Sequence, residues 1–127
     1  MKGTSDSSYI RQAIEELFRT HEEIVYIAAV NDKLDISIQK GLLNLHPSEL
    51  HILHVQAALL VSMSSVWSES LGPLAYISAS FGSVEVVVMA ISSKMHLVAV
   101  ISHRGASESE DTRESIVKQF KSVLLHM

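Results

Sequence analysis

Histidine is the residue type in this chain best suited to metal or acid–base chemistry, with seven copies in 127 residues. His51 and His54 are three positions apart, so on a helix their imidazoles lie on neighbouring positions of one side. Two imidazoles can share a metal ion, but zinc sites use three or four ligands. Glu49 is the only carboxylate close by in the sequence, and no further ligand has a suitable spacing. We therefore expect no metal site; the other interpretation of His46, His51 and His54 is a solvated helix face that titrates near neutral pH.

The sequence also lacks the local motifs of nucleophilic and phosphate-binding enzymes. There is no G-x-S-x-G motif, and Ser64-Ser65 falls in the middle of a predicted helix, where a nucleophile is poorly exposed. No P-loop or G-x-G-x-x-G motif is present, so we expect no nucleotide bound by a glycine-rich loop. Arg104 is either a charge-stabilising arginine for phosphoryl transfer or a solvated loop arginine. We predict that the chain is not an enzyme and needs no cofactor.

Composition narrows the classes of partner and compartment. The net charge is −4 and the ten basic residues are scattered, which argues against nucleic-acid binding. Cysteine is absent, which excludes disulfides and zinc thiolate sites. The N-terminal residues MKGTSDSSYIRQ contain no apolar signal region. The apolar stretches are shorter than the roughly 20 residues of a membrane span. We expect a cytoplasmic protein without a membrane span.

The most informative stretch is residues 74–91, which consist of LAYISASF, then Gly82-Ser83, then VEVVVMAI. The alternation of side chains predicts two strands, and a glycine at the start of the turn suits positive φ. The second strand carries one charge, Glu85, and is otherwise apolar on both faces. A strand that is apolar on both faces must be covered on both faces. A chain of this length has few helices for that purpose, so we expect a second copy to contribute.

The remaining pattern predicts one α+β domain with the order α-β-β-α-β-β-β-α. A first helix starts after a capping Ser7 or Ser8, and Asp111 is a plausible N-cap for the last one. The segment after the fifth strand, residues 103–110, is expected to be a loop. We predict a disordered segment 1–7 and a single domain 8–127. The expected strands are residues 24–30, 34–38, 74–81, 84–91 and 95–102, and the longest helix is residues 47–71.

The long helix begins at Pro47 and is ended by Gly72-Pro73. Its apolar residues form two stripes, of which one is expected to pack on the chain's own sheet and the other on a partner helix. The alternative is a helix buried within one subunit. The first stripe comprises Leu50, Leu53, Ala57, Leu60, Ser64, Trp67 and Leu71, and the second comprises Ile52, Leu59, Met63 and Val66.

Strand 74–81 is poor in charge and lacks lysine, the residue that commonly protects an exposed edge. Pairing with a symmetry-related copy would remove this aggregation risk, and a two-fold contact of that kind is self-complementary. Trp67 is equally compatible with anchoring a partner and with covering the sheet. Tyr76 is compatible with the same two roles. The residues that we predict for self-association are Leu53, Ala57, Leu60, Ser64 and Trp67 on the helix, and Tyr76, Ser78 and Ser80 on the strand.

Three segments resemble the Roadblock (dynein light chain roadblock-type) superfamily: the hairpin IVYIAAVNDKLDISI, the long helix ending at Leu71-Gly72, and the meander LAYISASFGSVEVVVMAISSKMHLVAVIS. The resemblance covers residues 8–126. It implies a five-stranded antiparallel sheet between the long helix and the two terminal helices. It also implies homo- or heterodimers, in which the helices corresponding to Pro47–Leu71 pair and the strands corresponding to Leu74–Phe81 join edge to edge.

The resemblance implies a non-catalytic binding module, because members of this superfamily act mainly as adaptors and as regulators of Ras-like small GTPases. The expected partners are a second copy of the chain and a small GTPase or scaffold protein. An alternative is a small-molecule sensor of profilin-like architecture, which would need a cavity with convergent polar groups. The high content of Val, Ile and Leu favours a filled core instead.

Overall fold

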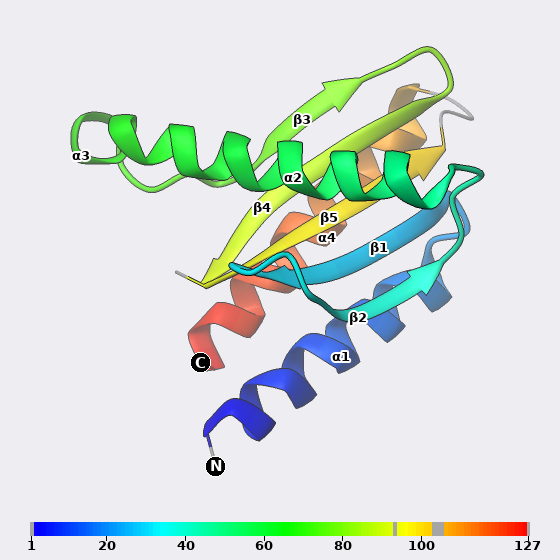
Figure 1. Ribbon diagram of the computed structural model, residues 1–127. Helices are drawn as coiled ribbons and strands as arrows, with labels where there is room; N and C mark the ends of the chain where they lie inside the picture. Colours follow the sequence, from blue (N-terminus) through cyan, green and yellow to red (C-terminus); the bar gives the residue numbers. More distant parts are fainter. Residues whose placement is uncertain (1, 93, 103–105, 127) are drawn as a thin grey trace.

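The computed structural model describes residues 2–92, 94–102 and 106–126, and it folds into a sheet between helices (Figure 1). The order of elements agrees with the predicted α+β order. The elements are α1 (Lys2–Thr20), β1 (Ile24–Asn31), β2 (Ile36–Gly41), α2 (Pro47–Ser64), η1 (Ser65–Trp67), α3 (Ser68–Leu71), β3 (Ile77–Ser80), β4 (Val84–Ser92), β5 (Met95–Ser102) and α4 (Ala106–His126).

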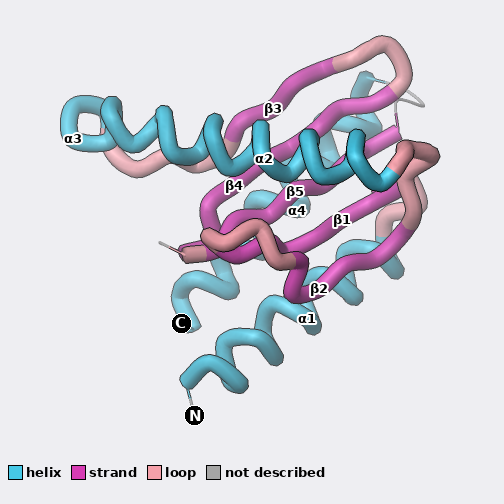
Figure 2. Tube along the Cα trace, in the orientation of Figure 1, coloured by secondary structure: helices cyan, strands magenta, loops and turns pink. Residues whose placement is uncertain are grey.

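The five strands form one antiparallel sheet in the order β2-β1-β5-β4-β3. Strands β1, β4 and β5 are central, and β2 and β3 are the two edges. Helix α2 crosses one face of the sheet, while α1 and α4 lie on the other (Figures 1 and 2). The predicted fold class, a five-stranded antiparallel sheet between one long helix and two terminal helices, is confirmed.

The larger of the two core layers lies between the sheet and the terminal helices. Alternate residues of each central strand point into it, as the two-residue period of a strand requires. Burying a side chain such as Phe or Leu contributes about 1.5–3 kcal/mol, so this layer supplies most of the folding free energy. Its largest members include Ile14 and Leu17 of α1, Ile116 and Phe120 of α4, and Val87, Met89, Leu97 and Ile101 of the sheet.

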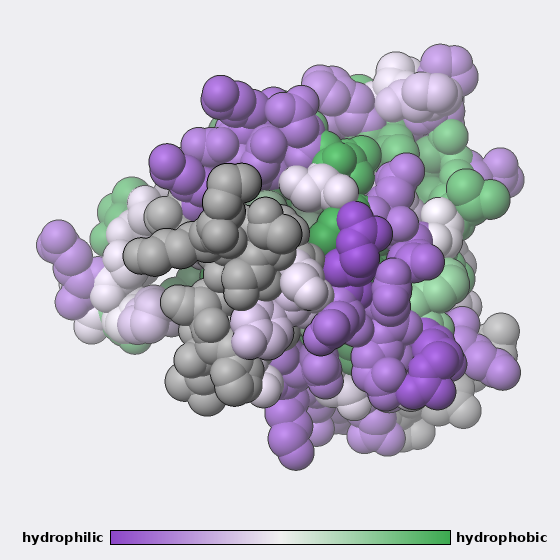
Figure 3. Space-filling view, turned by 90° about the horizontal axis from the view of Figure 1, so that it is seen from below, coloured by the Kyte–Doolittle hydropathy of each residue, from purple (hydrophilic) through white to green (hydrophobic). Residues whose placement is uncertain are grey.

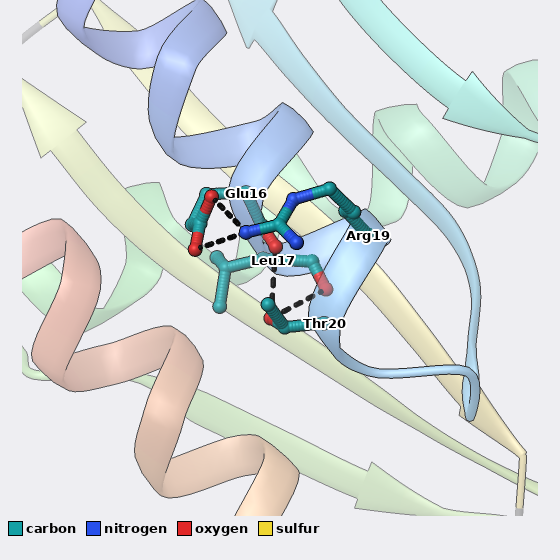
Figure 4. A network of polar contacts seen from close by, with 4 residues as sticks. All are labelled: Glu16, Leu17, Arg19 and Thr20. Carbon is teal, nitrogen blue, oxygen red and sulfur yellow. Dashed lines mark hydrogen bonds and ion pairs between the residues drawn. The ribbon is translucent and has the colours of Figure 1, made fainter.

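Helix α1 starts at Lys2, earlier than the predicted start after Ser7 or Ser8, so it includes residues 2–7 that we expected to be disordered. Near its C-terminal end, the Thr20 hydroxyl donates a hydrogen bond to the Glu16 carbonyl oxygen at 2.8 Å (Figure 4). Arg19 and Glu16 form an ion pair at 2.8 Å in which both side chains are more than half exposed. Such a surface pair contributes little stability, on the order of 0.2–1 kcal/mol.

The hairpin of β1 and β2 is confirmed, but β2 begins at Ile36 and not at Leu34. The reason is a side-chain-stabilised turn: Asn31 Oδ1 accepts hydrogen bonds from the Lys33 and Asp35 amides, both at 2.9 Å. Leu34 has a φ of +68° and belongs to this turn. At its other end, β2 extends to Gly41, which the sequence pattern assigns to a connector.

Gly41 is the position in the sheet where a larger residue is least tolerated. Its φ is +85°, and a Cβ there would lie 2.2 Å from the Val25 carbonyl oxygen. We expect Gly41→Ala to destabilise the fold by about 2–5 kcal/mol, because a left-handed conformation and a backbone clash add. Gly72→Ala is the matched control. Gly72 has a φ of +89°, but a Cβ added there would have no atom within 4 Å. Urea unfolding should show a loss at Gly72 of about 1–3 kcal/mol, because its φ of 89° and ψ of 174° form a backbone conformation adopted essentially by glycine alone; a loss at Gly41 no larger than the loss at Gly72 would contradict the close approach.

The predicted helix 47–71 is present as three consecutive pieces. His46 caps its start: the imidazole Nδ1 accepts from the Ser48 amide, and the Glu49 carboxylate accepts from the His46 amide. Towards its end, serine hydroxyls hydrogen-bond carbonyl groups three residues earlier, which favours the tighter 3₁₀ turn η1. Gly72, with positive φ, ends α3 as predicted.

The boundaries of β3 and α4 also differ from the sequence-based expectation. Strand β3 is shorter than predicted and covers Ile77–Ser80, so Tyr76 precedes it. Helix α4 starts at Ala106, and the prediction of a loop up to residue 110 with Asp111 as N-cap is wrong for the described part. Ala and Glu in the segment ASESED are good helix formers, and acidic residues suit a helix N-terminus. Arg104 lies outside the described residues.

Candidate binding surface

Helix α2 contacts the sheet with only one of its sides. Its half-buried Leu53 and Val61 and its buried Ala57 pack on Val88 and Val98, and Leu50 packs on a neighbouring group around Tyr26. These positions are three or four residues apart, as one side of a helix requires. The chain therefore covers a single stripe of a helix that is apolar on all sides.

The outward side of the same helix is apolar and exposed. Met63 is 66% exposed, Val66 76% and Trp67 64%, values far from those of a core. Large contiguous apolar patches are uncommon on monomeric proteins and mark interaction sites. By contrast, the side of the molecule seen in Figure 3 is largely hydrophilic, with smaller hydrophobic areas. The exposed outer stripe comprises Ile52, Leu59, Leu60, Met63, Val66, Trp67 and Leu71; we call it the α2 outer stripe.

By length and composition alone, the helical stretch Pro47–Leu71 is long and apolar enough to cross a membrane. The prediction that no segment of the sequence is long enough for a membrane span is therefore wrong on that criterion. In the fold, this stretch lies along the sheet and its inner side carries the buried His54.

The structure separates the helix residues that we predicted to mediate self-association. Ala57 is 2% exposed, and the half-buried Leu53 packs beside it on the sheet. Ser64 is half-buried, and its hydroxyl donates to the Val61 carbonyl oxygen at 2.6 Å. Leu60 and Trp67 are exposed. These two are the most exposed of the five predicted helix positions, and Trp67 does not cover the sheet core.

The predicted strand residues lie at the β3 edge of the sheet. Within the described residues β3 pairs only with β4, so its outer edge faces no other strand of the chain. Ser78 is opposite Val87 in the register and therefore points to the side of α4. Its hydroxyl donates to the Glu85 carboxylate. Tyr76 is 38% exposed, and the Arg113 guanidinium lies 5.9 Å from the centre of its ring. Ser80 lies opposite Glu85 in the same register.

The sequence pattern gives no indication of a buried ion pair that holds this edge to α4. Glu85 is only 3% exposed, and its Oε2 atom accepts a hydrogen bond from Arg113 Nη1 at 2.6 Å. The hydrogen bond to Glu85 raises the pKa of Arg113. The only signal in the sequence is Glu85 itself, the single charge in an otherwise apolar strand. Its partner comes from a helix 28 residues away, which spacing alone does not identify.

The three histidines at the start of α2 take up different positions. His46 caps α2, His51 is exposed, and His54 is buried against the sheet. Within the described part of the chain, no group of three or more metal-ligating side chains is present. His54 Nε2 lies 3.0 Å from the Tyr26 hydroxyl, which in turn donates to Gln39 Oε1 at 3.2 Å. This arrangement assigns the Nε2–H tautomer to His54.

Burial changes the titration of this group. It raises the pKa of Tyr26 to about 12. Burial lowers the pKa of His54, and the nearby His96 and His51 lower it further by smaller amounts through charge repulsion. Burial also lowers the pKa of His96. The region between α2 and the sheet therefore holds neutral histidines.

Acidification is expected to destabilise the fold through these two histidines. Their pKa values are lower in the folded state than in the unfolded chain, so the unfolded chain binds more protons. Stability is constant above the unfolded-state pKa of about 6.5 and falls below it, by up to about 1.4 kcal/mol per histidine near pH 5.5. Urea unfolding near pH 7.5 and pH 5.5 should show the loss, and His54→Gln should reduce it. An unchanged pH dependence in that variant would contradict the assignment.

Comparison with known proteins gives structural likeness without sequence likeness. No family model matches the chain, and no curated protein does. A Roadblock/LC7 domain from Streptomyces avermitilis is similar with a TM-score of 0.67 and 13% identity, over 91% of this chain and 95% of that one. The gliding protein MglB from Thermus thermophilus has a TM-score of 0.67 and 13% sequence identity, over 96% of this chain and 93% of that one. An MglB with a tetrameric arrangement has a TM-score of 0.65 and 13% sequence identity, over 91% of this chain and 87% of that one. Together with the order of strands and helices described above, these similarities show that the chain has the Roadblock/LC7 fold.

Proposed function

We propose that this chain is a non-catalytic, cytoplasmic binding module that forms a homodimer and presents the dimer surface to another protein, a small Ras-like GTPase or a scaffold. The observation that carries the proposal is the α2 outer stripe. Its residues are apolar, contiguous along the helix and mostly more than half exposed. A second copy would cover them, as about 800 Å² per subunit suffices for a stable interface.

The geometry of α2 favours one flank of the helix for this contact. Leu53 of α2 and Ile77 of β3 pack against the same core cluster of Ala57, Val88 and Val98, which places this flank of the helix on the β3 side of its contact with the sheet. Leu60 and Trp67 follow Leu53 at seven-residue intervals, which places them on the same flank. The apolar flank and the unpaired strand edge are therefore adjacent, and a two-fold axis there would pair helix with helix and β3 with β3.

The similar structures support this proposal without identifying the partner. One of them is an MglB with a tetrameric arrangement, so a protein of this fold self-associates. The resemblance of the sequence to the Roadblock superfamily implies regulation of Ras-like GTPases or an adaptor role. This chain would act by surface complementarity, in which the central apolar contacts supply most of the binding free energy.

Nucleotide-dependent capture tests the GTPase part of the proposal. Immobilised wild-type protein is incubated with native lysate that contains either GDP or a non-hydrolysable GTP analogue, and bound proteins are identified by mass spectrometry. We expect a small GTPase to be enriched in one nucleotide state and lost with Leu60→Glu. Retention of a scaffold protein in both states would favour the adaptor role. Recovery of neither kind of protein would contradict the proposal.

A further inference from the structure

A cleft of about 320 Å³ lies on the α4 side of the sheet, beside the β3 edge. Helix α4 leaves β3 uncovered there, because Ser78 and Ser80 lie opposite Val87 and Glu85 on the side that faces α4, and both serines are exposed. The ring of Tyr76 forms one wall of the cleft, and successive turns of α4 form the other. The lining residues are Tyr76, Arg113, Glu114, Val117, Lys118 and Lys121; we call this the α4 cleft.

The α4 cleft offers an apolar seat of fixed shape. The Tyr76 ring is 38% exposed, and it faces Val117 across the cleft. Arg113 binds the Glu85 carboxylate at 2.6 Å, and its guanidinium lies 5.9 Å from the centre of the Tyr76 ring. The ring is thereby held in place, because a cation is attracted to the face of an aromatic ring. The volume is at the lower limit of pockets that enclose small molecules, so it suits a side chain of a partner protein.

The charge at the rim of the cleft is positive. Lys118 and Lys121 are exposed and three residues apart, so they are neighbours on the helix surface. Among the described residues, no carboxylate forms an ion pair with either ammonium group. Of the described residues that line the cleft, only Glu114 carries a carboxylate, and the charge of Arg113 is offset by Glu85. Two lysines against one glutamate leave an excess of positive charge on a chain whose net charge is −4.

The α4 cleft is separate from the surface proposed for the dimer. Its lining residues all belong to one chain, and they lie on the opposite side of the sheet from α2. Edge-to-edge pairing of two β3 strands takes place in the plane of the sheet and leaves this side open. The inference below therefore depends neither on the α2 outer stripe nor on the proposed function.

We propose that the α4 cleft binds a short acidic segment of a partner protein. An apolar side chain of the segment packs between Tyr76 and Val117, and carboxylates on either side of it pair with Lys118 and Lys121. The apolar seat supplies affinity and the lysines supply the choice of partner, since charges at the rim of an interface act mainly on specificity. Glu114 disfavours segments with a denser run of acids.

Three peptides of equal length test this chemistry: acetyl-EDLDE-amide, its uncharged counterpart acetyl-QNLNQ-amide, and acetyl-EDSDE-amide without the apolar side chain. Binding is measured by isothermal titration calorimetry at about 0.15 M salt, where charges farther than about 8 Å are largely screened. We expect EDLDE to bind about three- to tenfold more tightly than QNLNQ, because each exposed ion pair contributes modestly. EDSDE should bind more weakly than EDLDE. Equal affinity for EDLDE and QNLNQ would overturn the proposal.

A pair of double variants assigns the preference to this cleft. Lys118→Gln with Lys121→Gln should abolish the preference for EDLDE over QNLNQ. Lys33→Gln with Lys94→Gln is the matched control, because it removes the same charge from two exposed lysines in the turns of the other hairpins. The control should keep the wild-type preference. Equal losses in the two double variants would show attraction to the charge of the whole chain and would contradict the proposal.

Two single variants separate the apolar seat from the charges. Glu114→Gln should tighten the binding of EDLDE and leave that of QNLNQ unchanged, a gain that a purely structural role of Glu114 does not predict. Tyr76→Ala should weaken both peptides by the same factor, with circular dichroism to confirm folding. An unchanged affinity for EDLDE in both variants would overturn the proposal.

Other occupants of the cleft have distinct outcomes. Backbone NMR resonances of α4 should shift when EDLDE is added, and shifts confined to α2 would contradict the proposal. If Lys118→Gln with Lys121→Gln lowers the molar mass in light scattering, the cleft holds a second copy of the chain instead. If phosphatidylserine vesicles bind through the two lysines and EDLDE does not compete, the occupant is a membrane surface. Either of these last two results would overturn the assignment to an acidic segment.

Discussion

Leu60→Glu is expected to convert the dimer into folded monomers. In the proposed arrangement, the two copies of residue 60 approach each other near the two-fold axis, so one substitution introduces two buried carboxylates. An uncompensated buried charge costs several kcal/mol, enough to lower the association constant by at least a hundredfold. Light scattering at fixed protein concentration measures the result directly as a decrease to one half of the molar mass.

Ile36→Glu is the matched control for this substitution. Ile36 is 40% exposed and Leu60 is 41% exposed, but Ile36 belongs to β2 at the other edge of the sheet. The control should retain the wild-type mass, since it introduces the same charge away from α2. If Leu60→Glu has the wild-type mass, the flank of α2 that we assigned to the partner is wrong.

Arg113→Met is expected to destabilise the fold by about 3–5 kcal/mol, because it removes from the buried Glu85 carboxylate the guanidinium that binds it at 2.6 Å. The substitution leaves the hydrogen bond from the Ser78 hydroxyl to Glu85 in place. The loss is measured by urea unfolding near neutral pH. A loss of this size would be a large part of the stability of a small domain.

The exposed ion pair of Arg19 provides the comparison. Arg19→Met removes a contact of 2.8 Å, close to the 2.6 Å of Arg113 with Glu85, but its partner Glu16 is solvated. We expect a loss of less than about 1 kcal/mol there. The double variant Arg113→Met, Glu85→Leu should recover most of the stability that Arg113→Met loses. Similar losses for both arginines would show that Glu85 is solvated.

The sequence was sufficient to predict the architecture. Strands with alternating or continuous apolar residues, such as Val84–Ser92, and a long apolar helix closed by Gly72 have strong local patterns. The errors arise where a few hydrogen bonds decide a boundary. The Asn31 side chain moves the start of β2 to Ile36, and no pattern of apolar residues encodes that.

The candidate surface was less predictable, because a helix that is apolar on all sides gives no periodic signal for its inner side. Leu53 and Ala57 were assigned to the partner, whereas in the structure Ala57 is buried on the sheet and Leu53 is half-buried beside it. The neutral His54 near His96 and the pair of Glu85 with Arg113 depend on contacts between distant segments. Such contacts become visible only when the strand order is known.

The central claim is that the α2 outer stripe is covered by a second copy of the chain. Sedimentation equilibrium of the wild-type protein over a dilution series into the low nanomolar range tests it most directly, with circular dichroism to monitor folding. We expect a mass of twice 14.0 kDa at high concentration, with dissociation only on strong dilution. A protein that sediments as a folded, soluble 14.0 kDa species at every concentration would contradict the claim.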